Sequence, residues 1–223
     1  MGYLGSKAAS GAYQAIISQM PPHDTYIETH LGSGAIFKAK QPSSSSIGID
    51  IDPDPIASFV KPYPASLINM DCVNYLNCFD FNAAGRVLVY SDPPYLHITR
   101  ASKSRYRFEY TDDDHVRLLE CLKSIPASVI ISGYPSQLYD ELLGDWRSLE
   151  FQVMTRGGPR TEKLWMNYDC EKNHWASFAG LNYIDRQRIK RKAERWAANY
   201  QKLPAGEQLS ILSSILATHI QNA

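Results

Sequence analysis

Short apolar runs alternate with amphipathic segments along most of the chain. Runs with strand-like composition occur at residues 25–30, 47–51, 66–71, 86–92 and 127–132. Apolar residues at helical spacing occur between and around them, at 6–20, 31–40, 72–78, 111–122 and 136–143. The run 86–92 is continuously apolar, as expected for a strand covered on both faces. The alternation predicts a mostly parallel sheet with right-handed crossovers.

The pattern changes toward the end of the chain. Residues 148–155 and 163–168 flank Gly157-Gly158-Pro159, which predicts an antiparallel last hairpin. Apolar residues at helical spacing in 189–200 and 209–219 predict two amphipathic helices joined at Lys202-Leu203-Pro204. We therefore expect an α/β domain over 1–180, with a Rossmann-like seven-stranded sheet. A basic helical hairpin is expected over 181–223.

Composition excludes several classes of protein. The 223 residues contain 23 Lys and Arg against 23 Asp and Glu, so the net charge is zero. The sequence contains no apolar run of signal-peptide or membrane-span length. The four cysteines form no CxxC pair, as in reduced intracellular proteins. These features predict a cytoplasmic protein with no membrane partner and no metal site.

Four predicted strands end at or next to an acidic residue: Glu28, Asp50, Asp71 and Asp92. The carboxyl ends of parallel strands line one crevice, so these side chains are expected to gather around a ligand. Grouped carboxylates are costly unless they bind hydroxyl, amino or cationic groups. S-adenosylmethionine carries all three. For Asp71 alone, a cap on the helix 72–78 is an equally good interpretation.

A glycine pair follows the first of these acids. Gly32 and Gly34 lie between a strand and a helix, where the backbone can approach a ligand closely. A simple tight turn would use the same residues. The third glycine of the dinucleotide fingerprint is absent, which disfavours NAD.

The run 86–92 leads directly into Asp92-Pro93-Pro94-Tyr95. Each proline lacks an N–H and fixes its own φ, so the chain leaves the sheet as a stiff element. The Asp92 carboxylate and the Pro93 carbonyl could each accept one N–H of an adenine amino group, and Tyr95 could stack on the base. A proline-rich strand exit with a buried tyrosine is the simpler interpretation, but it leaves the acid unexplained.

With these motifs, the chain resembles the D12-type DNA adenine-N6 methyltransferases, the Dam-like methylases of bacteria and phages. Residues 92–95 match the catalytic motif of that family. Residues 28–37 are similar to its cofactor motif, with Thr29-His30 where many members have Pro-Phe, and residues 1–7 resemble its N-terminal motif. The similarity runs in family order over residues 1–170.

This resemblance implies a reaction and a set of site residues. The reaction is methyl transfer from S-adenosylmethionine to the N6 of a flipped adenine in double-stranded DNA. Tyr3, Lys7, Asp50 and Asp92 would contact the cofactor, with Asp71 and Cys72 near its adenine. Family members can act beside a cognate restriction endonuclease, and the sequence leaves this partnership open.

Candidate nucleic-acid contacts lie in three cation-rich segments, 97–110, 155–163 and 185–202. Cations interleaved with aromatic residues suit phosphate contact and base stacking. In 97–110, a strand with a buried aromatic face is an equal alternative. The candidates are Arg100, Lys103, Arg105, Tyr106, Arg107, Arg156, Arg160, Arg188, Lys190 and Arg191.

One departure from the family leaves the substrate open. Many Dam-like enzymes carry a target-recognition domain between the acid of the second strand and the catalytic motif. Here, two strands and their helices fill the segment between Asp50 and Asp92. Either recognition of the target sequence sits elsewhere in the chain or the enzyme is loosely specific. Methylation of adenine in RNA and a non-catalytic nucleic-acid-binding module with a vestigial pocket are two separate alternatives.

Overall fold

The structure is a computed structural model that describes residues 7, 12–99, 107–155, 158–169 and 183–220. The chain divides into two compact units, Met1–Trp175 and Ala176–Ala223. The predicted boundary between 180 and 181 falls in a segment outside the described residues.

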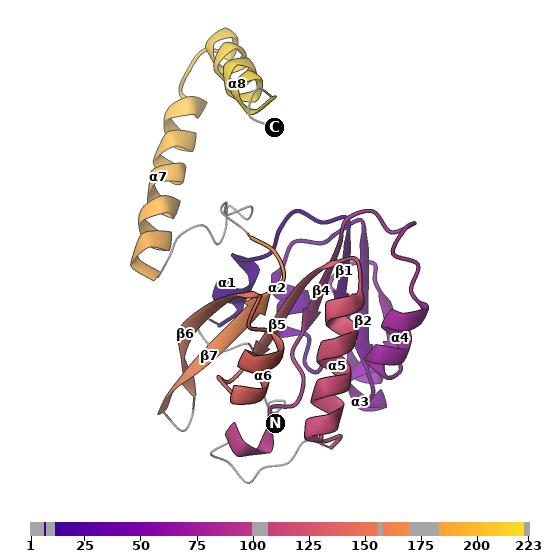
Figure 1. Cartoon of the computed structure of the whole chain (residues 1–223). Helices are drawn as coiled ribbons and strands as arrows, with labels where there is room; N and C mark the ends of the chain where they lie inside the picture. Colours follow the sequence, from indigo (N-terminus) through magenta and orange to yellow (C-terminus); the bar gives the residue numbers. More distant parts are fainter. Residues whose placement is uncertain (1–6, 8–11, 100–106, 156–157, 170–182, 221–223) are drawn as a thin grey trace. The chain divides into compact units, whose positions relative to one another are not determined.

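The first unit is built on one seven-stranded sheet in the order β3-β2-β1-β4-β5-β7-β6 (Figure 1). Its strands are β1 (Thr25–Glu28), β2 (Ser45–Asp50), β3 (Ser66–Asn69), β4 (Val87–Ser91), β5 (Ser128–Gly133), β6 (Arg147–Thr155) and β7 (Gly158–Met166). The first five strands are parallel, and β7 runs antiparallel to both β5 and β6. The predicted mostly parallel seven-stranded sheet with an antiparallel last hairpin is confirmed.

Helices cover both faces of this sheet. They are α1 (Ala12–Ile17), α2 (Ala35–Ala39), α3 (Pro53–Ser58), α4 (Cys72–Cys78), α5 (Asp112–Ser124) and α6 (Gln137–Leu142), with a 3₁₀ turn at His97–Thr99. Buried residues of α4, α5 and α6 share one apolar cluster with the sheet. On the other face, Phe37 of α2 packs on Tyr26 of β1, with ring centroids 5.7 Å apart.

Alternation along the central strands explains this two-sided burial. Val87 and Val89 of β4 point into the cluster with α4, α5 and α6. Leu88 and Tyr90, which point to the opposite face, are also buried. A strand with both faces covered reads as a continuous apolar run, so the interpretation of 86–92 was correct.

Two local predictions were incomplete. Pro53 and Pro55 were expected only to break the second strand, but Pro53 begins α3 and Asp52 caps it by accepting from the Asp54 N–H at 3.1 Å. Proline suits the first helical position because that N–H has no intrahelical acceptor. The last strand was expected from Lys163, yet β7 already begins at Gly158.

The second unit contains α7 (Tyr183–Gln201) and α8 (Ala205–Ile220), so the two predicted C-terminal helices are confirmed. The Tyr200 hydroxyl donates to the Gln208 carbonyl at 2.8 Å, and the Gln208 side chain donates to the Leu203 carbonyl at 2.8 Å. These bonds fix the turn between the helices. No helix in the described ranges is both long and apolar enough to cross a membrane.

Candidate active site

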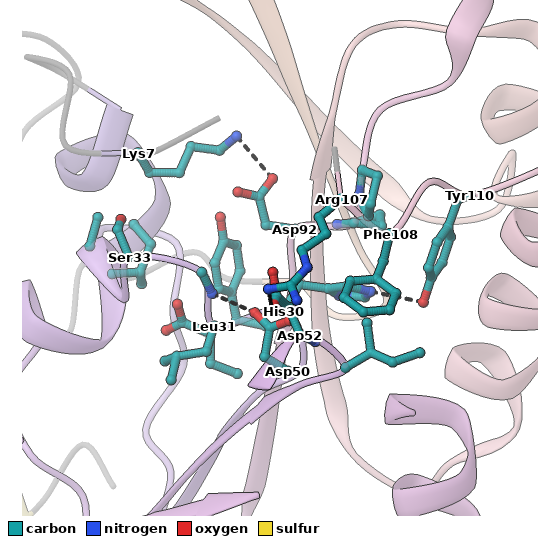
Figure 2. A pocket seen from close by; sticks show the side chains of 18 residues that line it. Lys7, His30, Leu31, Ser33, Asp50, Asp52, Asp92, Arg107, Phe108 and Tyr110 are labelled. Atoms are coloured by element: carbon teal, nitrogen blue, oxygen red, sulfur yellow. Dashed lines mark hydrogen bonds and ion pairs between the residues drawn. The ribbon is translucent and has the colours of Figure 1, made fainter. Parts of the chain in front are cut away.

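A pocket lies at the carboxyl ends of β1, β2 and β4 (Figure 2). The strand order reverses here, because β2 lies on one side of β1 and β4 on the other. Open α/β sheets bind ligands at such a switch point. The residues predicted from the sequence that line this pocket are Lys7, Glu28, Gly32, Asp50, Asp92, Pro93, Pro94 and Arg107.

Asp50 fastens the glycine turn to the end of β2. Its Oδ2 accepts from the Gly32 N–H at 2.8 Å, and its Oδ1 accepts from the Asp52 N–H at 2.9 Å. Gly32 has φ 47, a left-handed conformation that glycine adopts without steric cost. Burial raises the pKa of Asp50, and the backbone N–H groups oppose this. Each carboxylate oxygen has a second lone pair, so Asp50 can still accept from a ligand.

Glu28 forms the deeper acidic wall of the pocket. Its side chain is buried and accepts a hydrogen bond from the Tyr26 hydroxyl at 2.7 Å. Burial raises the pKa of Glu28 to about 8, and the nearby Asp92 charge adds to the rise. Glu28 is therefore largely protonated at neutral pH and can donate to a ligand as well as accept from it.

Asp92 stands where β4 leaves the sheet. Its Oδ1 accepts from Lys7 Nζ at 2.9 Å and from Ser132 Oγ at 2.8 Å. Because Ser132 gives its proton to Asp92, its oxygen accepts from the Tyr90 hydroxyl, 2.9 Å away. Within the described residues, both contacts fall on Oδ1, so Oδ2 remains available to a donor from a substrate.

Lys7 is a buried ammonium held by two acids. Besides Asp92, its Nζ lies 3.4 Å from Glu162 Oε2 of β7. Burial alone would lower the pKa of Lys7, but Asp92 and Glu162 hold it above its usual value. The ammonium is therefore charged throughout the physiological range.

Tyr95 is packed into this ionic cluster. Its hydroxyl accepts from Lys7 Nζ, and that nitrogen lies 4.6 Å from the centre of its ring. Tyr134 meets the ring edge-on, with centroids 4.5 Å apart, and Tyr95 is only 8% exposed. Tyr95 is thus held by Lys7 and Tyr134, and its stacking on a base stays a prediction.

Arg107 closes one side of the pocket. Its Nη1 lies 3.0 Å from Asp52 Oδ1 (Figure 2). The same nitrogen also pairs with Asp54 of α3. With Phe108 beside it, the remaining cavity is about 70 Å³, well below the several hundred Å³ typical of ligand pockets. The structure thus places this predicted nucleic-acid contact at the pocket rim, paired with two carboxylates.

Sequence reasoning missed the wall formed by His30 and Tyr110. His30 Nε2 lies 3.0 Å from the Tyr110 hydroxyl, and both residues line the pocket. Burial lowers the pKa of His30 to about 3, so its ring is neutral. Thr29-His30 was noticed as a departure from the family motif, and Tyr110 as part of an aromatic alternation, but nothing in the sequence pairs them.

Three predicted cofactor residues stand behind this lining. Asp71 caps α4 by accepting from the Asn74 N–H at 2.9 Å and pairs with Arg117 at 2.8 Å. The Cys72 sulfur lies 3.8 Å from both His30 Nε2 and the Tyr110 hydroxyl. Gly34, at φ 61, supplies the left-handed residue before α2. For Asp71, the helix-cap interpretation is correct.

The remaining predicted residues fall elsewhere or outside the described ranges. Arg160, on β7, borders a second, more open hollow of about 780 Å³ that also includes Tyr134. Arg188, Lys190 and Arg191 belong to α7 of the second unit. The residues outside the described ranges are Tyr3, Arg100, Lys103, Arg105, Tyr106 and Arg156.

No protein-family model matches this sequence, and no curated protein does. Among solved structures, the chain is similar to a putative RNA methyltransferase from Pyrococcus horikoshii, with 8% identity, a TM-score of 0.48, and coverage of 74% of this chain and 89% of that one. It is also similar to a methyltransferase from Agrobacterium tumefaciens described as SAM-dependent, with 11% identity, a TM-score of 0.44, and coverage of 70% of this chain but only 60% of that one.

A third similar structure is the magnesium protoporphyrin IX methyltransferase from Synechocystis with bound SAM. The identity is 13%, the TM-score is 0.42, and the alignment covers 69% of this chain and 74% of that one. Identities this low do not carry the activity of those proteins to this chain.

Proposed function

We propose that this chain is an S-adenosylmethionine-dependent methyltransferase that modifies adenine N6 in double-stranded DNA. The observation that carries the proposal is the position of Asp92, Pro93 and Pro94, which leave β4 beside the pocket. Lys7 and Ser132 hold Asp92 Oδ1, so the carboxylate is fixed before any substrate arrives. Such preorganisation is how an enzyme stabilises a transition state without reorganising its own groups.

The pocket lining suits S-adenosylmethionine. The Gly32 turn offers close backbone approach, and Asp50 can accept from ribose hydroxyls. Asp92 lines the pocket as an acidic group for the ammonium and sulfonium, and protonated Glu28 can donate or accept a hydrogen bond. The resemblance to the D12-type enzymes over residues 1–170 supports the same assignment. Arg107 and Phe108 must move to admit a ligand of this size, because the cavity is only about 70 Å³.

When bound, S-adenosylmethionine supplies an electrophilic methyl group on sulfur. In the proposed reaction, Asp92 Oδ2 and the Pro93 carbonyl each accept one N–H of adenine N6. The nitrogen lone pair then forms the new N–C bond while the C–S bond breaks and sulfur keeps its electron pair. Asp92 accepts the proton that N6 loses and returns it to solvent.

Two groups of cations would hold the nucleic acid. Arg160 borders the hollow next to Tyr134, and α7 carries Arg188, Lys190 and Arg191 on an exposed helix. Phosphate contacts of this kind position a duplex without reading its sequence. This agrees with a chain that lacks an inserted target-recognition domain and implies loose sequence choice.

The test measures N6-methyladenine by mass spectrometry after incubation with S-adenosylmethionine and unmethylated duplex DNA. We expect product from the native protein and a loss of about 10²-fold or more in Asp92→Asn, the size found for removal of one preorganised group. Asp145→Asn is the matched control, since that carboxylate is 72% exposed and lies 3.7 Å from Lys123 of α5. Full activity in Asp92→Asn would refute the mechanism.

The same assay separates the alternatives. Product on RNA but not on DNA would make the chain an RNA adenine methyltransferase. Binding of the cofactor in calorimetry without any methylated base would favour a non-catalytic module.

A further inference from the structure

A second carboxylate stands next to Asp92 and comes from the last strand of the sheet. Glu162 of β7 is almost fully buried, and its Oε2 is 3.4 Å from Lys7 Nζ. The same nitrogen is 2.9 Å from Asp92 Oδ1. One ammonium is therefore shared by two acids.

The sheet itself does not require an acid at this position. The β5–β7 ladder ends at Gly133 and Lys163, so Glu162 lies one residue beyond it. A buried carboxylate is costly unless it is paired and hydrogen-bonded. The groups that face Glu162 are Lys7, Asp92, Tyr95 and Tyr134, which all belong to the Asp92 site.

The arrangement has a direct electrostatic consequence. If Lys7 paired with Asp92 alone, the ammonium would neutralise that carboxylate and weaken it as a hydrogen-bond acceptor. The Lys7 ammonium also interacts with Glu162, which partly offsets its positive potential at Asp92. A negative charge on Glu162 therefore makes the potential at Asp92 more negative. Burial raises the pKa of Glu162, and Lys7 opposes that rise.

We propose that Glu162 is a positioning residue: it holds Lys7 between two carboxylates, so that Asp92 keeps one oxygen fixed and the other available to the amino group of the substrate. This rests on the methyl transfer proposed above. Glu162 touches no reacting atom and acts through Lys7.

The first test is kinetic. In Glu162→Gln, kcat is expected to fall about 10- to 100-fold, while KM for S-adenosylmethionine and for DNA changes less than about 3-fold. Glu162→Asp keeps the charge and should recover much of kcat. Glu150→Gln, an exposed glutamate on β6, is the matched control.

The kinetic results distinguish positioning from simple stabilisation. A structural role would lower activity only in proportion to the folded fraction, which thermal unfolding measures, and Glu162→Asp would then restore activity only as far as it restores folding. Either that result or an unchanged kcat would overturn the proposal.

A second measurement does not depend on activity. Carbon-13 NMR of labelled aspartate side chains, with Asp92→Asn to identify the signal, gives the chemical shift of the Asp92 carboxyl carbon in the native protein and in Glu162→Gln at one pH. A changed chemical shift in the variant supports the coupling, and an unchanged one overturns it. If the native protein methylates neither DNA nor RNA, the proposed function fails, and this measurement still decides whether Glu162 acts on Asp92.

Discussion

Removal of the Arg107 side chain should open the cofactor pocket and tighten cofactor binding. In the structure, its guanidinium bridges Asp52 and Asp54 across the rim and leaves a cavity of about 70 Å³. A ligand the size of S-adenosylmethionine must break these pairs as it enters. The free energy that the pairs contribute is therefore subtracted from the binding free energy.

The exposure of the partners sets the magnitude. Arg107 is 56% and Asp54 75% exposed, so this pair contributes little, while Asp52 is only 11% exposed and its pair contributes more. Taken together, pairs of this kind contribute about 1 kcal/mol. Because 1.4 kcal/mol is a factor of ten in affinity, Arg107→Ala should bind about 5-fold more tightly.

Calorimetry with S-adenosylmethionine and with S-adenosylhomocysteine measures this effect. Arg86→Ala is the control, since it removes a similarly exposed ion pair with Asp24. Arg86 directly precedes β4, so this pair lies at the amino ends of the strands, away from the pocket. Higher salt should weaken the Arg107 pairs and bring the native protein closer to the variant. If Arg107→Ala binds the cofactor more weakly, Arg107 contacts the ligand directly and the reasoning is wrong.

Three further outcomes are expected. The pKa of Glu28 is raised from 4.5 to about 8, so the contribution of protonated Glu28 to stability is complete below pH 4.5 and is lost as pH rises through 8. Urea unfolding across this range should show a decline in the free energy of unfolding that Glu28→Gln lacks. An equal decline in both proteins would contradict this expectation. Gly34→Ala should lower the free energy of unfolding by at least about 1–2 kcal/mol, because φ is 61 and the new methyl group would overlap the Phe59 ring; unchanged urea unfolding would show that the turn relaxes. Exchange of three α7 cations for glutamine should reduce the slope of log affinity against log salt for duplex DNA by about 2.7, whereas an unchanged slope would exclude α7 from the interface. The exchanged residues are Arg188, Lys190 and Arg191.

The sheet could be predicted from the sequence because buried strands are rich in apolar residues. Strands covered on both faces are short apolar runs, and β4 and β5 both appear in this form. The caps were also predictable, since Thr111 forms the full capping box with Asp114 at the start of α5. Propensity and tertiary packing agree at these positions.

The acids at the strand ends were predicted in part. Glu28, Asp50 and Asp92 meet at one pocket because parallel strands bring their carboxyl ends to the same edge. Asp71 instead pairs with Arg117, a residue of α5. No local pattern in the sequence identifies that partner, so the choice between ligand contact and structural pair was not predictable.

The partners of Arg107 and Glu162 were likewise not predictable from the sequence. Arg107 sits in a cation-rich stretch, and its partners Asp52 and Asp54 lie at a helix that the prolines concealed. Glu162 lies between Thr161 and Lys163, in a polar stretch where a buried acid and an exposed one look alike. Only the three-dimensional pairing with Lys7 distinguishes it.

That pairing has a consequence for the order in which the protein is made. Lys7 precedes every strand of the sheet along the chain, whereas Glu162 belongs to β7, which lies between β5 and β6. Long-range pairings of this kind form late, because the intervening chain must first be ordered. A nascent chain that has already folded β1 to β5 would hold Asp92 but would still lack the acid that shares its lysine. The ionic cluster is therefore complete only after the last hairpin has docked, so the proposed chemistry would begin after the catalytic unit has finished folding.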